Sequence, residues 1–135
     1  MIKLIKNKRN DTLFRCIYSL IIKKFNKKYI KVVNIGSGKN FFLEKKFQSK
    51  SSVCGQYKFY NYDFFTDQEI NNNKKNQIYC YKINNKSTFK ASDIIIINDV
   101  LHHKYYRGLD YDKVGKFLTR LSKKTNYIFI KDHFS

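Results

Sequence analysis

The sequence predicts an α/β fold, a doubly wound and mostly parallel sheet of about five strands, and three observations carry this prediction. Short β-branched apolar runs alternate with segments of helical periodicity, which is typical of parallel sheets whose connections are helices. The run at residues 94–97 contains only isoleucine, as in a strand that is buried on both faces. A glycine pair, Gly36 and Gly38, directly follows another such run.

Three segments have the spacing of helices. Between about residues 9 and 28, apolar side chains recur near the helical period, with lysines and arginines between them. A short helix is expected after the glycine pair, over about residues 41–47, and a clear one nearer the C-terminus, over 109–121. Residues 71–76 read Asn-Asn-Asn-Lys-Lys-Asn, a polar low-complexity stretch that we interpret as a surface loop.

Five segments are expected to be strands. They are short and rich in β-branched or aromatic residues. In chain order they cover residues 30–35, 56–65 with an end near Asp63, 78–83, 93–98 and 126–131. Ligands of such sheets bind beyond the carboxyl ends of the strands, so the residues that follow each strand are the candidates for a site.

The chain has 135 residues, enough for one domain with its own core, and 42% of them are hydrophobic. We expect a single domain over residues 1–135, in which a helical segment, 1–29, precedes an α/β core, 30–135. Neither an apolar run of about 18 residues nor a signal-peptide pattern is present. A soluble cytoplasmic protein without a membrane partner is therefore expected. Three cysteines without a Cys-x-x-Cys pair do not indicate a zinc site.

The formal net charge of +18 is the strongest compositional bias. Such a charge is typical of proteins that bind nucleic acid or another anionic partner. However, Lys, Asn, Ile, Tyr and Phe dominate the whole chain, proline is absent and Ala91 is the only alanine, which is the composition that AT-rich codons impose. The lysines are also spread along the chain and form no compact block. Mutational bias therefore explains the charge better, and nucleic acid is the less favoured partner.

The turn Asn34-Ile-Gly-Ser-Gly-Lys-Asn40 follows the first expected strand and suits a nucleotide-like ligand, because glycines allow a tight turn and close approach to main-chain amides. A dinucleotide fingerprint needs another glycine where Phe41 stands, so NAD is disfavoured. A P-loop is disfavoured because its glycine spacing before Lys39 is absent. The turn resembles the first motif of class I S-adenosylmethionine-dependent methyltransferases, acidic-x-Gly-x-Gly-x-Gly, with Asn34 and Asn40 as departures.

Later segments resemble further motifs of this family, in the family's order. Asp63 ends the second strand, where the family has a carboxylate for the ribose hydroxyls, and Asn84 follows the third, beside the adenine. Residues 92–103, which end in Asn-Asp-Val-Leu-His-His, resemble the strand-four motif, and 128–133, Ile-Phe-Ile-Lys-Asp-His, resemble the strand-five ending of small bacterial members. The resemblance implies a Rossmann-like methyltransferase fold and the cofactor S-adenosylmethionine. The implied cofactor-binding residues are Asn34, Gly36, Ser37, Gly38, Asp63, Asn84, Asn98 and Asp99.

Four polar residues just after neighbouring strands are the candidate catalytic residues: Asp99, His103, Asp132 and His133. If these strand ends converge, an imidazole or carboxylate there can act as general base on the methyl acceptor. Positioning acceptor and methyl group in line supplies much of the catalysis without any special side chain. The resemblance implies a small-molecule acceptor. No metal site is expected, since His133 is the only further histidine beside the adjacent His102 and His103.

The sequence ends just after the fifth expected strand, whereas typical members of the family have a seven-stranded sheet. We therefore expect a methyltransferase sheet without its C-terminal strands, in which residues 127–130 form an edge that a partner chain or a second copy covers. Two other functions stay open. One is a non-catalytic remnant or interaction subunit, because Asn34 and Asn40 depart from the motif. The other is an RNA methyltransferase that uses the charge of +18 for contacts to the RNA backbone.

Overall fold

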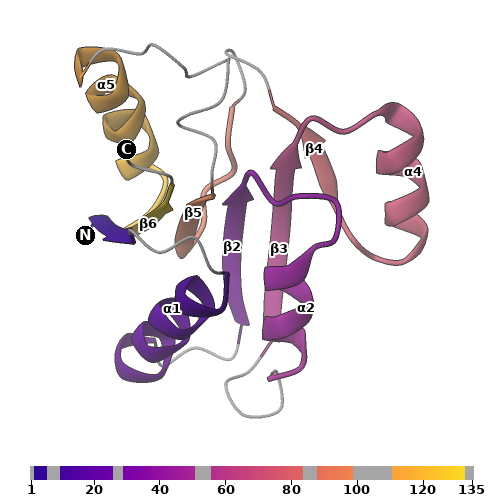
Figure 1. The fold of residues 1–135 in the computed structure, drawn as a ribbon, viewed down its shortest axis with the longest axis horizontal. Coiled ribbons are helices and arrows are strands. Elements are labelled where there is room, and N and C mark those ends of the chain that lie inside the picture. Colours follow the sequence, from indigo (N-terminus) through magenta and orange to yellow (C-terminus); the bar gives the residue numbers. More distant parts are fainter. Residues whose placement is uncertain are drawn as a thin grey trace.

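The computed structural model of the chain describes residues 2–5, 10–25, 29–50, 56–83, 88–98 and 111–132. Within these residues the six strands form one sheet in the order β1-β6-β5-β2-β3-β4, and every neighbouring pair is parallel (Figure 1). The elements in chain order are β1 (Ile2–Ile5), α1 (Asn10–Lys24), β2 (Tyr29–Ile35), α2 (Phe42–Gln48), β3 (Gln56–Asp63), α4 (Asp67–Lys75), β4 (Cys80–Lys82), β5 (Ile94–Asn98), α5 (Tyr111–Ser122) and β6 (Tyr127–Lys131). The predicted α/β class and the parallel sheet are thus confirmed.

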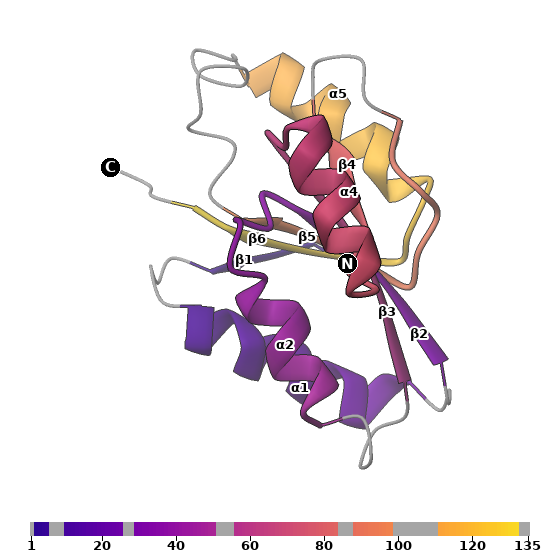
Figure 2. The same cartoon turned by 90° about the vertical axis from the view of Figure 1, so that its right-hand side faces the viewer.

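Helices lie on both faces of the sheet, with α1 and α2 on one side and α5 on the other (Figure 2). Alternate residues of each strand point to opposite faces, so the sheet has two apolar clusters. Ile94 and Ile96 of β5 face α1 and α2, whereas Ile95 and Ile97 face α5. All four isoleucines are 0% exposed, as predicted for a strand covered on both sides.

The N-terminal segment contains a strand that the sequence analysis missed. Strand β1 pairs in parallel with β6, with Ile2 opposite Ile128 and Ile5 opposite Lys131. The sheet therefore has six strands rather than about five, and the segment 1–29 contains β1 as well as the expected helix. The prediction of an edge at residues 127–130 is wrong. The chain covers that edge itself, so the sheet needs no partner chain or second copy at β6. Because Lys3 interrupts an apolar stretch of four residues, the segment carries no clear strand pattern.

The polar stretch at residues 71–76 is not a loop, because α4 includes most of it. This helix begins with a capping box: the Thr66 hydroxyl accepts a hydrogen bond from the Glu69 amide at 3.1 Å, and the Glu69 carboxylate accepts one from the Thr66 amide at 2.9 Å. None of the residues of this helix is buried, so packing contributes little to its stability and the capping box contributes correspondingly more. The sequence signal was Thr66-x-x-Glu69, which the asparagine-rich composition outweighed.

The remaining expected elements lie within a few residues of their predicted positions, although β4 is shorter than expected. No helix in the described part of the chain is both long and apolar enough to cross a lipid bilayer.

Replacing the capping threonine tests whether α4 depends on its cap. Thr66→Ala removes the oxygen that accepts from the Glu69 amide and should lower the free energy of unfolding by about 1 kcal/mol. Thr66→Ser keeps a hydroxyl and should retain most of that stability. Urea unfolding followed by circular dichroism measures both, and equal stability of Thr66→Ala and the unchanged protein would contradict this role.

Candidate functional site

The carboxyl ends of β2 and β5 meet where the connections of the sheet change direction. From β2 the chain proceeds outward to β3 and β4, whereas from β5 it proceeds the other way to β6. Open parallel sheets bind ligands in the crevice that such a divergence leaves. The glycine turn follows β2 at this point, and Asp63 and Asn98 end the two neighbouring strands.

The glycine turn folds over the end of β3. Gly36 and Gly38 have φ angles of 80° and 71°, in the left-handed region that favours glycine. The amides of Gly36 and Ser37 both donate to the carbonyl of Tyr62, at 2.7 and 3.2 Å. Ser37 also donates its hydroxyl to the Gly38 carbonyl at 3.1 Å. The turn is therefore fixed by backbone bonds to the neighbouring strand.

Asp63 completes this attachment. Its Oδ2 accepts a hydrogen bond from the Gly38 amide at 2.7 Å, and its Oδ1 accepts one from the Phe64 amide at 2.8 Å. Bonds from amides to an ionised carboxylate are among the stronger hydrogen bonds in proteins. A carboxylate offers about four lone-pair positions, so both oxygens keep capacity for a further donor. Asp63 is half-buried, which leaves part of the carboxyl group accessible at the edge.

Space remains beside Gly38. A Cβ atom added at Gly38 would meet no atom within 4 Å. Asn40, which replaces the family's third glycine, is exposed and has no positive φ. The left-handed residue is instead Phe41, with φ 52°, and its buried ring stacks on Phe65 at 5.9 Å between centroids. Packing thus stabilises an unfavourable backbone at Phe41, and Asn40 imposes no such strain.

A salt bridge connects the turn to α4. Lys39 Nζ lies 3.1 and 2.9 Å from the two carboxylate oxygens of Glu69, the residue that also closes the capping box. The hydrogen bond from Lys39 and that from the Thr66 amide lower the pKa of Glu69 to about 2. The glycine turn is thereby attached to β3 on one side and to α4 on the other.

Polar side chains are buried beneath the turn, on the side of α1 and α2. Asn34 of β2 stands opposite Asn61 of β3, and they are 1% and 0% exposed. Asn61 donates to Glu44 Oε1 at 2.7 Å and to the Tyr79 carbonyl at 3.2 Å. Neither polar atom of the Asn34 side chain has a hydrogen-bond partner among the described residues, which is uncommon for a buried amide. Asn34 is therefore a core residue below the site.

Two further polar residues pair at the ends of β5 and β6. Lys131 Nζ donates to Asn98 Oδ1 at 3.2 Å, and the two side chains stand opposite each other in the sheet. Asn98 is 8% exposed, and both Lys131 and the following Asp132 are 2% exposed. Of the four candidate catalytic residues, Asp132 is the one in the described part of the chain, and protein atoms cover it.

The other predicted site residues, Asn84, Asp99, His103 and His133, lie outside the described residues, as does His102. The described part of the chain contains no group of three or more His, Cys, Asp or Glu side chains arranged to hold a metal ion.

The sequence analysis did not single out Glu44 or Asn61. Asn61 carried a detectable signal, because it is a polar residue at an inward position of the alternating strand β3. Glu44 carried none, because the sequence does not show which face α2 turns to the sheet.

No family model matches the chain, and neither a curated protein nor a solved structure matches it significantly. A functional assignment therefore depends on the site geometry and on the motif resemblance.

The buried Glu44 carboxyl predicts a specific pH dependence. Burial raises the pKa of Glu44, although the Asn61 hydrogen bond and the charges of Lys58 and Lys45 partly oppose this. The folded state then holds the Glu44 proton more tightly than the unfolded state does. The free energy of unfolding should fall as the pH rises from the ordinary value of 4.5 through the pKa of the folded state.

Urea unfolding of Glu44→Gln at several pH values above 4.5 measures this contribution. The variant should show a smaller decline than the unchanged protein, because glutamine has no charge to bury. Glu69→Gln is the control of opposite sign: the folded pKa of Glu69 is about 2, so its stabilising contribution grows as the pH rises through 4.5 and is constant well above it. A constant difference for Glu44→Gln would contradict the assignment.

Proposed function

We propose that the chain binds S-adenosylmethionine at the carboxyl edge of the sheet and transfers its methyl group to a small-molecule acceptor. The observation that carries the proposal is the bond between Asp63 and the Gly38 amide, beside open space at Gly38. This hydrogen bond joins the glycine turn to the end of β3, and the class I methyltransferase resemblance assigns both to the same cofactor. The bond lies at the edge where a parallel sheet binds ligands.

The residues at this edge suit an adenosyl ligand. A ligand can approach Gly38 closely because no side chain intervenes. The remaining lone pairs of Asp63 can accept two ribose hydroxyl groups. On the methyltransferase resemblance, Asn98 at the end of β5, the following residue Asp99, and Asn84 beside the adenine contribute to the cofactor site. Asn34 is buried in the core beneath the turn.

S-adenosylmethionine supplies an electrophilic methyl group on its sulfonium. The chain contributes the binding surface and the orientation of the acceptor toward that group. On the same resemblance, Asp99, His103 and His133 are the proposed groups that remove a proton from the acceptor.

Calorimetric titration with S-adenosylmethionine tests the binding step. The unchanged protein should bind it saturably. Gly38→Asn should abolish binding while it keeps the fold, because asparagine tolerates a left-handed backbone but places a side chain in the open space. Asp63→Ala should weaken binding at least about tenfold through the loss of charge-assisted hydrogen bonds.

Gly115→Ala is the matched control for Gly38→Asn. It also adds side-chain atoms at a glycine with open space around it, but within α5 rather than at the site. This variant should bind like the unchanged protein. A folded protein that shows no saturable binding, or binding that Gly38→Asn leaves intact, would refute the proposed site.

A second candidate function is a non-catalytic subunit that binds the cofactor without methyl transfer. The burial of Asp132 favours it, since a carboxyl group that is 2% exposed does not reach an acceptor. Incubation with radiolabelled S-adenosylmethionine and a small-molecule extract separates the two functions. Transfer that His103→Ala or His133→Ala abolishes would exclude the non-catalytic subunit, whereas saturable binding without any transfer would support it.

A further inference from the structure

Tyrosines form a row on the α5 side of β3 and β4, which we call the tyrosine face: Tyr60, Tyr62 and Tyr81. The alternation of β3 points Tyr60 and Tyr62 to this side, and Tyr81 of β4 stands opposite Tyr62. Tyr62 is buried, and the other two tyrosines are partly exposed. Such a row of rings on a sheet offers planar surfaces to a ligand.

The rings are in mutual contact. Tyr62 and Tyr81 stack with their centroids 5.1 Å apart, and Tyr60 lies 6.0 Å from Tyr81. The row continues through Phe89, whose ring packs edge-on against Tyr62 at 4.9 Å and against Phe117 of α5 at 6.2 Å. Aromatic contacts therefore extend from the β4 side of the sheet to α5.

Lysines stand over these rings. Lys58 Nζ lies 5.9 Å from the centroid of Tyr60. It lies 3.5 Å from the centroid of Tyr79, which precedes β4 and lines a pocket with Glu44 and Gln48 of α2. Lys90 Nζ lies 5.4 and 5.5 Å from the centroids of Tyr60 and Tyr81. None of the residues that make these contacts is acidic, but the charge of Lys58 also acts on the Glu44 carboxyl. Compositional bias explains why lysines are numerous, but it does not place two of them over one set of rings.

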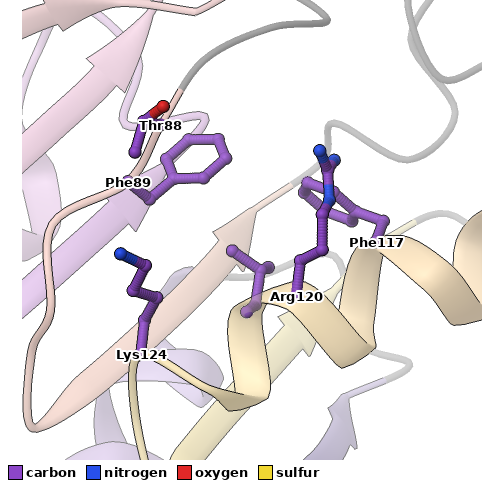
Figure 3. Close-up of a pocket in the computed structure, with 6 residues that line it drawn as sticks. Thr88, Phe89, Phe117, Arg120 and Lys124 are labelled. Carbon is purple, nitrogen blue, oxygen red and sulfur yellow. The ribbon is translucent and has the colours of Figure 1, made fainter.

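A pocket of about 140 Å³ lies where this row reaches α5 (Figure 3). Thr88 and Phe89 line one side of it, and residues of α5 and the turn after it line the other (Figure 3). Arg120 lies over the Phe117 ring, 5.7 Å from its centroid. Among the described residues, neither Arg120 nor Lys124 forms a salt bridge. The pocket thus combines an apolar floor with two available cations.

No described helix packs on the tyrosine face at β3 and β4, where Phe89 and the Lys90 backbone contact Tyr62 instead. Cys80, next to Tyr81 but on the opposite face, packs with Phe41 and Phe65 in the cluster that α4 joins through Ile70. Helix α5 lies on the same face but packs on β6, near the opposite end of the strand order. Partly exposed rings with cations among them consequently remain available at the surface.

We propose that the tyrosine face, with the adjoining pocket, binds single-stranded nucleic acid. Unpaired bases stack on aromatic rings, and the lysines and Arg120 neutralise the phosphates. A duplex keeps its base faces covered and cannot use the rings. Binding of this kind does not require the cofactor site, so it stands or falls independently of the proposed methyl transfer.

Fluorescence anisotropy with labelled oligo(U), oligo(dT) and a duplex of equal length, without S-adenosylmethionine, tests the proposal. At least one single strand should bind more tightly than the duplex, and the comparison of the two strands separates RNA from DNA. Tyr60→Ala/Tyr81→Ala should weaken binding about tenfold or more, whereas Tyr60→Phe/Tyr81→Phe keeps the rings and should retain it. Phe42→Ala, which removes an exposed ring on α2, should have no effect.

Two pairs of lysine substitutions, one on each side of the sheet, separate specific contacts from general electrostatics. They leave all aromatic rings in place. Lys58→Gln/Lys90→Gln should weaken single-strand binding and reduce its logarithmic salt slope by about 1.4, measured between about 50 and 200 mM salt. Lys23→Gln/Lys24→Gln removes the same charge from exposed positions of α1 and should leave the slope nearly unchanged. Equal effects of the two pairs, equal affinity for the duplex, or no binding of any strand would overturn the proposal.

Discussion

The hydrogen bond from the Gly38 amide to Asp63 is the interaction on which the organisation of the carboxyl edge depends. The turn after β2 has two left-handed glycines and no regular structure of its own, so its shape is set by what its amides bind. The Tyr62 carbonyl and the Asp63 carboxylate provide these acceptors, and both lie at the end of β3. The register between β2 and β3 brings donors and acceptors together.

The same constraint accounts for the surroundings of the turn. The glycines leave open space beside Gly38, while the unfavourable backbone occurs at Phe41, where burial and stacking on Phe65 stabilise it. Lys39 attaches the other side of the turn to Glu69 of the capped helix α4. Beneath the turn, Asn61 holds the buried carboxyl of Glu44. The edge is thus supported from three directions while its outer surface stays accessible.

Local patterns predicted the α/β class, because consecutive isoleucines such as Ile94–Ile97 indicate a strand buried on both faces. All four of these isoleucines are buried in the structure. The meeting of Gly38 with Asp63 was also foreseeable, since parallel strands end at one edge. Strand β1 was not, because only pairing with the distant β6 stabilises its four residues. The hydrogen bond between Glu44 and Asn61 depends on which face α2 turns toward the sheet. The aromatic row depends on contacts between elements that are remote in sequence. Neither appears in a local pattern.

The central claim is that the glycine turn, held by Asp63, is a ligand site for the adenosyl group. An amide-resolved NMR titration of the protein with S-adenosylmethionine tests it most directly. The account predicts saturable shifts of the Gly36, Gly38 and Phe64 amides, with little change at Tyr60 and Tyr81. Saturating cofactor that leaves the amides of the turn unshifted would contradict it.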